Sequence, residues 1–540
     1  MSFRLTGGIV SAGLAVCTLL SALAPEAWAQ SARDIEPLSL FVSSGEAPAR
    51  PIGVLRSKLV ELDLDLLAAE DAIVLDLGAG LSVLALKDAA RSERAGTRAW
   101  FGEVAGSPNG DVRMVRRGDV VVGTVRANGQ LYRLRPDGAG HHLLELIDET
   151  LLPGCADLPS AMDVYGDAPG SGGGSTTGGG STTTNAPEID MLVVYTTAAR
   201  NGAGGTDGML ALIELAMLET NQAFENSGID ARVRLVHTAE LSGYAESGSF
   251  GTELTRLRTL ADGYIDEVHE LRDLHGADQV TMISNGSGSC GIGYVQDTPS
   301  SWFEQLAFTV VSRNCATGYY SFAHELGHNL GCQHDHANAG NGAYDYSFGH
   351  RASNDQWRTI MSYAPGSRIQ HVSNPSVAYA NESTGVPAGQ IDAADNAETI
   401  RNLAGAMSEF RDRPVEAYGV GRLNSLGQRP IALWSGSPSV FAGGFSLELS
   451  NGMPGQGGVL HVGVTATQTP FMGGTLLASL PLARVGTYQV DDDGHAAIDI
   501  VPAAADVGTT RYYQFLFRDP GQPAGAGVAM SNGVRVRFLP

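Results

Sequence analysis

The 540-residue sequence predicts a multidomain chain in which a central α/β domain with a mixed sheet lies between two β-rich domains. Three observations support this prediction. Residues 169–185 are almost entirely Gly, Ser and Thr, a composition that cannot bury a hydrophobic core. Between residues 188 and 413, apolar residues alternate between strand-like and helix-like spacing. From residue 414 onward, helical spacing disappears and short strand patterns alternate with turn residues.

The composition excludes several classes of protein. The chain has 58 acidic and 35 basic side chains, which leaves a formal charge of −23. Phosphate backbones repel a chain this acidic, and no Lys/Arg cluster is present, so we expect no nucleic-acid binding. Hydrophobic residues make up 43% of the chain, which is too many for a chain disordered throughout. The absence of sustained heptads excludes a coiled coil.

The N-terminus has the pattern of an export signal. Arg4 supplies a positive charge, residues 9–23 form a short apolar run, and residues 27–29 (Ala-Trp-Ala) form a small-x-small cleavage motif. The run is shorter than the roughly 20 residues that a membrane span needs, and no later segment is long and apolar enough. We therefore expect a signal peptide at 1–29 and a secreted protein, extracellular or periplasmic in transit, without a membrane span.

The region after the signal has the features of a β-rich domain. Apolar or alternating residues at 120–125 and 131–134 predict strands, and Asn-Gly and Asp-Gly pairs predict the turns between them. We expect this domain to cover 30–167 and to be followed by a flexible, protease-accessible linker at 168–187. Because the domain lies between an export signal and a cleavable linker, we predict that it is a propeptide.

The central domain is predicted from its alternating elements. Their order along the chain, β-α-β-α-β-β, favours a mostly parallel sheet. A last helix then closes the domain before Arg413-Pro414. The predicted strands cover 189–195, 231–237, 280–283 and 308–311, and the predicted helices cover 209–224, 254–274 and 396–410.

The C-terminal region, residues 414–540, is predicted to be a β-sandwich accessory domain. Short strands such as 445–449 and 512–517 alternate with Gly, Pro and Asp turns. Two roles stay open for this domain: binding a surface or a carbohydrate, and acting as an export determinant that is removed on maturation.

One short stretch carries the candidate chemistry. His324 and His328 lie four residues apart, so they share one face of a predicted helix. Glu325 can reach a water on an ion held by these histidines without binding the ion itself. Gly331 tolerates the positive φ that ends a helix sharply and returns His334 to the same point. Three neutral imidazoles and one water form an open tetrahedral zinc site.

This stretch resembles the HExxHxxGxxH signature of the metzincin metallopeptidases, which is followed by a methionine turn. Residues 359–363 (Thr-Ile-Met-Ser-Tyr) are similar to that turn. The resemblance implies that Met361 forms a hydrophobic floor under the metal histidines. It implies that Tyr363 binds zinc or the tetrahedral intermediate, the alternative being that Tyr363 only packs. Asp335 follows the third histidine as in reprolysin-like members, where it steadies the zinc-site loop.

Two later segments, 373–377 and 395–400, resemble the tail of the bacterial peptidyl-Asp metalloendopeptidase family, a reprolysin-like branch. The resemblance covers roughly residues 188–412. It implies a zinc endopeptidase with one Zn²⁺ per catalytic domain, acting on protein or peptide substrates. In such a site the metal lowers the pKa of its water towards about 7, and Glu325 removes the proton as general base. We expect the strand at 308–311 to pair with the extended substrate.

The same branch implies a cationic group that meets an acidic residue at the cleavage site. Arg351 and Arg368 lie in the right region of the sequence, and the alternative for each is a solvated surface arginine. Three further histidines near the motif, His336, His350 and His371, are expected to lie at the surface or behind the ligands.

Four cysteines remain after the signal, and their pairing stays open. Cys155 has two interpretations: a latency switch whose thiolate takes the water position of the zinc site, or a disulfide with one of the other three. Cys290 and Cys315 are expected to staple the loops before the active-site helix. Cys332 is expected to be structural.

Two alternatives complete the predictions. Asp335 and Asp345 could bind Ca²⁺, although no DxDxDG ladder is present. The chain could also be a secreted binding or adhesion protein with an inactive protease-like domain. The retained Glu325 and its histidines favour the enzyme.

Overall fold

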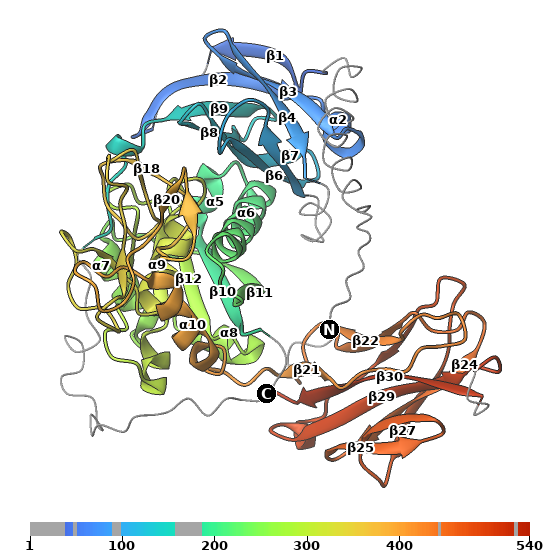
Figure 1. Ribbon diagram of the computed structural model, residues 1–540. Coiled ribbons are helices and arrows are strands. Elements are labelled where there is room, and N and C mark those ends of the chain that lie inside the picture. Colours follow the sequence, from blue (N-terminus) through green and yellow to red (C-terminus); the bar gives the residue numbers. More distant parts are fainter. Residues whose placement is uncertain are drawn as a thin grey trace, which may run out of the picture.

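The computed structural model describes residues 38–46, 51–88, 99–156, 186–440, 444–522 and 527–539. The predicted signal peptide at 1–29 lies outside the described residues, as do residues 168–185 of the predicted linker. Figure 1 shows a blue N-terminal sheet above a green-to-yellow α/β region, with an orange-to-red β region beside it.

The N-terminal region is one nine-stranded sheet in the order β1-β2-β9-β8-β7-β6-β5-β4-β3, with every neighbouring pair antiparallel. Asn128 and Gly129 form the predicted tight turn between β7 and β8, both with positive φ. The strands are β1 (Phe41–Glu46), β2 (Val54–Leu62), β3 (Ala72–Gly78), β4 (Leu81–Lys87), β5 (Ala99–Val104), β6 (Asp111–Arg117), β7 (Val120–Ala127), β8 (Gln130–Pro136) and β9 (His142–Ile147), with a helix α2 (Leu64–Ala69) and a 3-10 turn η1 (Glu149–Leu151).

The central region contains a five-stranded sheet in the order β11-β10-β12-β14-β13. Four of these strands run parallel and β13 alone is antiparallel to its neighbour, so the predicted mostly parallel sheet is confirmed. The strands are β10 (Glu188–Thr196), β11 (Arg232–Leu241), β12 (Gln279–Ser284), β13 (Gly291–Gly293) and β14 (Phe308–Ser312). The helices are α5 (Thr197–Gly202), α6 (Thr206–Asn226), α7 (Phe250–Arg258), α8 (Glu267–His275), α9 (Ser321–Asn329) and α10 (Asn396–Met407).

Two predictions for this region were wrong. The single helix at 254–274 is two helices, α7 and α8, because Ala261 and Gly263 both adopt positive φ between them. The Asp266 carboxylate accepts hydrogen bonds from the backbone of residues 262 and 263 and stabilises this turn. The strand at 308–311, expected to pair with substrate, is β14, which is hydrogen-bonded on both sides. The edge strand at this end of the sheet is β13, and the edge strand at the other end is β11.

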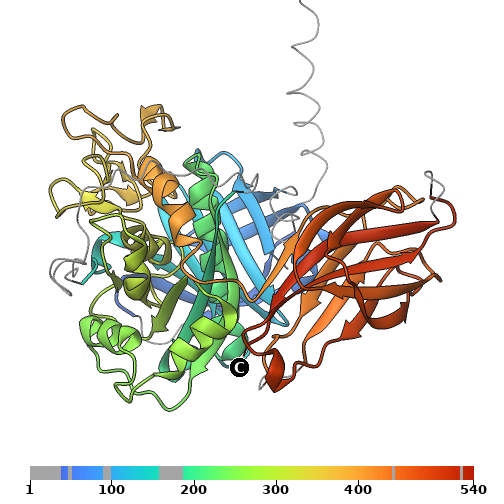
Figure 2. The same ribbon diagram turned by 90° about the horizontal axis from the view of Figure 1, so that it is seen from below.

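The C-terminal region is built from antiparallel strands. One sheet has the order β21-β30-β29-β24-β27, a second has the order β22-β23-β28, and their apolar side chains share one core. Figure 2 shows this region in red beside the α/β region. The strands are β21 (Val415–Tyr418), β22 (Ile431–Ser435), β23 (Ser446–Ser450), β24 (Gly457–Gly463), β25 (Ala466–Phe471), β26 (Gly474–Ala478), β27 (Ala483–Gln489), β28 (Ala496–Asp499), β29 (Thr510–Arg518) and β30 (Val528–Arg537).

Among the helices of the described residues, none has the length and apolar character that crossing a membrane requires.

The N-terminal sheet packs on the central region through β6 and β7, which lie against α6. Val115 and Val122 of these strands belong to the same hydrophobic core as the central sheet. Polar contacts reinforce the junction: Arg133 donates to the carbonyl oxygen of Asn314 at 2.6 Å, and Thr124 donates to the carboxylate of Glu219 at 2.9 Å. The N-terminal sheet is therefore joined to the central region by both apolar packing and hydrogen bonds.

Glu219 makes this junction sensitive to pH. Its carboxylate is buried on α6 and also accepts from the backbone N–H of Gly318, and burial raises its pKa from 4.5 to about 7. The folded chain then holds a proton that the unfolded chain releases above pH 4.5. The stability due to this group is fully present below pH 4.5 and is lost as the pH rises through about 7.

We expect Glu219→Gln to flatten this part of the pH dependence. The amide oxygen of Gln can accept a hydrogen bond from Gly318 or Thr124, as the Glu219 carboxylate does, and the amide carries no charge to bury. The shift from 4.5 to about 7 corresponds to about 3 kcal/mol of stability lost between pH 4.5 and 8 in the native chain. Urea unfolding across this range measures it. Equal pH slopes for the two proteins would contradict the prediction.

Candidate metal centre and active site

Helix α9 ends as the sequence predicts. Gly331 has φ +80°, and the N–H of Cys332 donates back to the carbonyl of Gly327 at 2.9 Å, so the chain reverses immediately after the helix. A Cβ on Gly331 would lie 2.6 Å from the Cβ of Ala343, so no other residue fits there. The reversal carries residues 333–335 back alongside the helix as the short strand β15 (Gln333–Asp335).

The reversal brings three imidazoles together. The Nε2 atom of His334 lies 3.3 Å from Nε2 of His324 and 3.1 Å from Nε2 of His328. All three side chains are buried. The structure therefore converges on one point the three histidines that the sequence singled out.

Each of these rings faces a backbone carbonyl with its other nitrogen. The Nδ1 atoms of His324, His328 and His334 lie 2.7, 2.9 and 3.3 Å from the carbonyl oxygens of residues 360, 332 and 338. The Nδ1–H must donate to these oxygens, which leaves three Nε2 lone pairs facing each other. Burial lowers the pKa of all three, that of His334 to about 4, so the rings stay neutral. Three converging lone pairs with no hydrogen between them fit a metal ion.

Cys155 supplies a fourth atom to this cluster. Its Sγ lies 2.8 Å from Nε2 of His324 and 3.0 Å from Oε1 of Glu325. The candidate ligand atoms of Cys155 and the three histidines all lie within 4.8 Å of one another. Burial and the adjacent Glu325 raise the pKa of the Cys155 thiol well above its usual value. A thiolate at this position therefore needs a cation beside it.

The other cysteines resolve the open pairing. Cys290 and Cys315 form a disulfide, as expected, whereas Cys155 and Cys332 are free thiols. Cys332 is completely buried, in keeping with a structural role. The alternative in which Cys155 forms a disulfide is wrong for this structure.

The segment around Cys155 pairs with the edge strand β13. The N–H of Ala156 donates to the carbonyl of Gly291, and the N–H of Cys290 donates to the carbonyl of Gly154, each at 2.9 Å. The bridge between Cys155 and Gly291 is parallel. A Cβ on Gly291 would collide with the side chain of Glu325, so glycine permits the strand to lie this close to the helix. The edge available to an extended peptide is thus β13.

Glu325 lies beside the cluster, one residue after the first histidine. It is completely buried, and its Oε2 atom has no hydrogen-bond partner. Burial raises its pKa to about 8, although Cys155 and the positive charge of Arg368 act in the opposite direction. A buried carboxylate with one unused oxygen next to a metal position is suited to accepting a proton.

The remaining residues of the motif surround the histidines. The Tyr363 ring lies 4.2 Å from that of His334, and burial together with Cys155 raises the pKa of its hydroxyl, so the phenol keeps its proton. Met361 is buried with its sulfur beneath Gly327. Asp335 accepts a hydrogen bond from the backbone of Tyr363 at 3.0 Å and ion-pairs with Arg351 at 2.9 Å. Asp335 therefore ties the third histidine to the methionine turn.

The two candidate arginines have different surroundings. Arg351 is held by Asp335, so its charge is already neutralised. Arg368 is only 2% exposed, stacks 4.1 Å from the ring of Tyr319, and donates from Nη1 to the carbonyl of Tyr319. Among the described residues, no acceptor faces its Nε. After burial, the positive charge of Arg368 is a further cause that lowers the pKa of His324, His328 and His334.

Two residues of this site, Arg358 and Tyr319, were not found from the sequence. Arg358 donates to Tyr319 Oη at 3.1 Å and to the carbonyls of Ser362 and Gly366, which braces the loop before Arg368. Tyr319 precedes the helix, and no short motif marks either residue.

The other predicted ligand positions are not part of the cluster. In the described ranges, the group of Cys155 and the three motif histidines is the one with metal-ligand spacing. It excludes His336, His350 and His371, as expected. It also excludes Asp335 and Asp345, so the predicted Ca²⁺ site gains no support.

Comparisons with known proteins agree with this geometry. The Reprolysin_5 model, metallo-peptidase family M12, matches residues 185–373. A peptidyl-Asp metalloendopeptidase from Stenotrophomonas maltophilia (strain R551-3) is 37% identical over 311 residues, which cover 56% of this chain and 71% of that protein. One from Xanthomonas campestris pv. campestris is 34% identical over 372 residues, 66% of this chain and 86% of that protein. The chain belongs to the peptidyl-Asp metalloendopeptidase family.

Membership in the peptidyl-Asp metalloendopeptidase family makes the chain a zinc metalloendopeptidase, a hydrolase that acts on peptide bonds. Among solved structures, metalloproteinase-II from Bacteroides fragilis covers 56% of this chain and 87% of its own, at 12% identity and a TM-score of 0.32.

Proposed function

We propose that this chain is a secreted zinc endopeptidase, made as a latent proenzyme, with a preference for acidic residues at the cleavage site. His324, His328 and His334 hold one zinc ion, and Glu325 is the general base. The observation that carries this proposal is the convergence of three Nε2 lone pairs beside a buried carboxylate whose Oε2 has no partner.

Different residues of the chain would carry out different steps of peptide hydrolysis. A zinc ion held there would act as a Lewis acid that lowers the pKa of a water towards about 7. Glu325 accepts the proton of the attacking water and passes it to the leaving amine. Tyr363, whose hydroxyl keeps its proton, donates a hydrogen bond to the developing oxyanion. The backbone of Cys290 and Gly291 on the edge strand binds the extended substrate once residues 154–156 have left it.

Metal removal tests this proposal directly. We expect purified, activated chain to contain one zinc ion and to hydrolyse casein, and we expect a chelator to abolish the activity and added Zn²⁺ to restore it. The measurements are elemental analysis and release of labelled peptides. A folded, zinc-loaded chain that leaves casein intact would instead support the alternative, a secreted binding or adhesion protein with an inactive protease-like domain.

The position of Cys155 supports the proposal of latency. Its sulfur lies beside the three imidazole nitrogens as a fourth candidate ligand atom, so it would take the place of the water on a bound zinc ion, and the segment that carries it pairs with the edge strand. In this proposal, residues 30–167 are the propeptide domain, 168–187 is the linker that is cut, and 188–413 is the peptidase domain. The signal peptide at 1–29 directs secretion, and residues 414–540 form a β-sandwich accessory domain that either binds a surface or a carbohydrate or acts as an export determinant.

The acidic preference rests on Arg368. A buried guanidinium whose Nε has no acceptor can bind a carboxylate in a side-on, bidentate geometry. Nη1 is already used by Tyr319, which fixes the orientation of the group. The relatives carry the name peptidyl-Asp metalloendopeptidase, which agrees with this chemistry.

We expect Arg368→Gln to remove most of the discrimination between Asp and Asn at the cleavage site. Hydrogen bonds to charged groups contribute about 1.5–3 kcal/mol, so the ratio of the two kcat/KM values should fall by about 10- to 100-fold. Arg368→Lys should restore only part of it, because an ammonium lacks the planar fork. Arg401→Gln, an exposed arginine on α10, is the control. An unchanged Asp/Asn ratio in Arg368→Gln would exclude this role.

A further inference from the structure

Leu152 lies three residues before Cys155 and contacts the central region, called the catalytic region below because it carries the candidate active site. Its side chain packs against a small apolar cluster formed by the Cys290–Cys315 disulfide and the ring of Tyr319. The preceding residue, Leu151, is 54% exposed. The chain thus directs one of two adjacent leucines onto the wall of the active site and leaves the other in solvent.

The path of the segment makes this contact part of the substrate groove. Residues 154–156 hydrogen-bond to Cys290 and Gly291 of the edge strand, and the hydroxyl of Ser289 also donates to the carbonyl of Gly154 at 2.8 Å. An extended chain spans about 3.3 Å per residue, so Leu152 lies within about 10 Å of the residue on the metal position. A peptide substrate on the same edge would pass the same wall.

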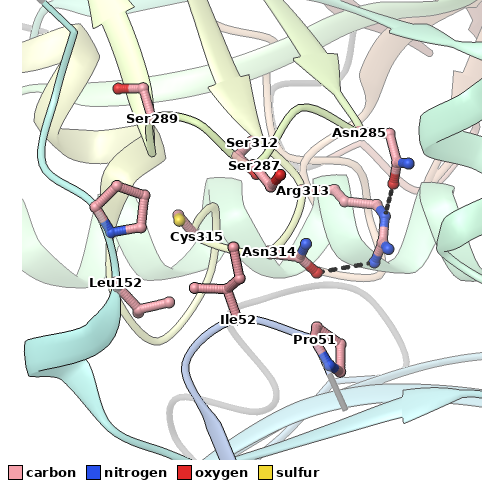
Figure 3. A pocket seen from close by; sticks show the side chains of 11 residues that line it. Pro51, Ile52, Leu152, Asn285, Ser287, Ser289, Ser312, Arg313, Asn314 and Cys315 are labelled. Atoms are coloured by element: carbon pink, nitrogen blue, oxygen red, sulfur yellow. Dashed lines mark hydrogen bonds between the residues drawn. The ribbon is translucent and has the colours of Figure 1, made fainter. Parts of the chain in front are cut away.

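A cavity of about 360 Å³ continues from this contact. Figure 3 shows Leu152, Ile52 and Pro51 on one side of it and Ser312, Asn314 and Arg313 on the other. The first side belongs to the N-terminal region and the second to the catalytic region. The disulfide, Tyr319 and the polar wall all remain with the catalytic region when residues 38–156 are removed, so the site of the Leu152 side chain becomes open to substrate.

We propose that the Cys290–Cys315 disulfide and Tyr319 form a subsite for an aliphatic side chain of the substrate, which Leu152 fills in the proenzyme. The inference rests on the proposed function and deepens its substrate class. Tyr319 links this subsite to the acidic one, because the same ring stacks on Arg368 at 4.1 Å. A preferred substrate then carries an acidic residue and a nearby Leu, Ile or Val on the same side of the scissile bond.

The competing interpretation is that Leu152 only joins the two regions, since it also contacts the apolar cluster of Val54, Leu131 and Ile147 in the N-terminal sheet. That contact disappears with the N-terminal region. The two interpretations therefore differ after activation: a subsite then binds an aliphatic side chain of the substrate, whereas a simple interface binds nothing.

The experiment uses the full chain activated by limited proteolysis and fluorogenic peptides with one fixed Asp. Leu is compared with Ser at each of three positions on either side of that Asp. Burying a leucine side chain contributes about 1.5–3 kcal/mol, so Leu should raise kcat/KM by about tenfold or more at one position. Peptides that are cleaved at equal rates at every position would overturn the subsite and leave the proposed function standing. If no peptide and no casein is cleaved, the proposed function fails and the subsite with it.

A second measurement uses synthetic peptides that correspond to residues 151–156. Leu152→Ala in this peptide should weaken its inhibition of the activated enzyme by about tenfold. Leu151→Ala is the matched control and should leave inhibition unchanged, because that leucine is exposed. Equal inhibition by the two variant peptides would overturn the subsite.

Discussion

Glu325→Gln is expected to lower kcat/KM for peptide hydrolysis by about 10³-fold, within the range that general acid–base catalysis contributes. Gln has nearly the shape of Glu, so it fits the space beneath Gly291, but it cannot take a proton from water. The Nε2 atoms of the three histidines do not depend on this carboxylate for their orientation, because each ring is held through Nδ1 by a backbone carbonyl. We therefore expect the variant to bind zinc as the native chain does.

The measurement combines turnover of a fluorogenic peptide with zinc analysis of the same preparation. Glu398→Gln is the control for the chemical change, since this carboxylate lies on α10 and pairs with Arg401. We expect native turnover from it. A Glu325→Gln protein that holds zinc and retains more than about a tenth of native kcat/KM would exclude Glu325 as the general base.

The parts of the site that the sequence predicted are those fixed by local geometry. His324 and His328 share a face because they are one helical turn apart, and Gly331 turns the chain because its φ is positive. Both relations depend only on residues near in sequence. The mostly parallel sheet was also predictable, because the order of strands and helices can be recognised from the spacing of apolar residues along the chain.

What the sequence did not predict depends on contacts between distant segments. The edge strand next to the active site is β13, three residues with no strand pattern of their own, and the longer β14 lies inside the sheet. Arg368 and Tyr319 are 49 residues apart and come together only because the methionine-turn loop folds back over the start of α9. The apolar periodicity also overestimated the length of the helix predicted at 254–274, because the helical spacing continues through the turn at Ala261 and Gly263.

Cys155→Ser is expected to make the uncut full chain active. Serine preserves the size of the side chain and the backbone pairing with β13, but a hydroxyl is a far weaker zinc ligand than a thiolate. A loss of about 1.4 kcal/mol in the free energy that holds residues 154–156 on the site raises the fraction of open sites about tenfold. Metal–thiolate bonds contribute more free energy than this. The measurement is hydrolysis of a fluorogenic peptide, with mass spectrometry to confirm that no chain has been cut.

A thiol-specific reagent separates the two ways in which the segment could block the site. If the sulfur holds the segment on the metal, modification of Cys155 activates the native chain and has no further effect on Cys155→Ser. Cys332 does not interfere, because it is completely buried. If the segment blocks the groove only by covering β13, the Cys155→Ser chain stays latent. The hydrogen bonds that the segment forms with Gly291 and Cys290 are made by its backbone and do not involve the sulfur. Full latency of the uncut Cys155→Ser chain would therefore exclude the metal–thiolate switch and leave steric coverage as the cause.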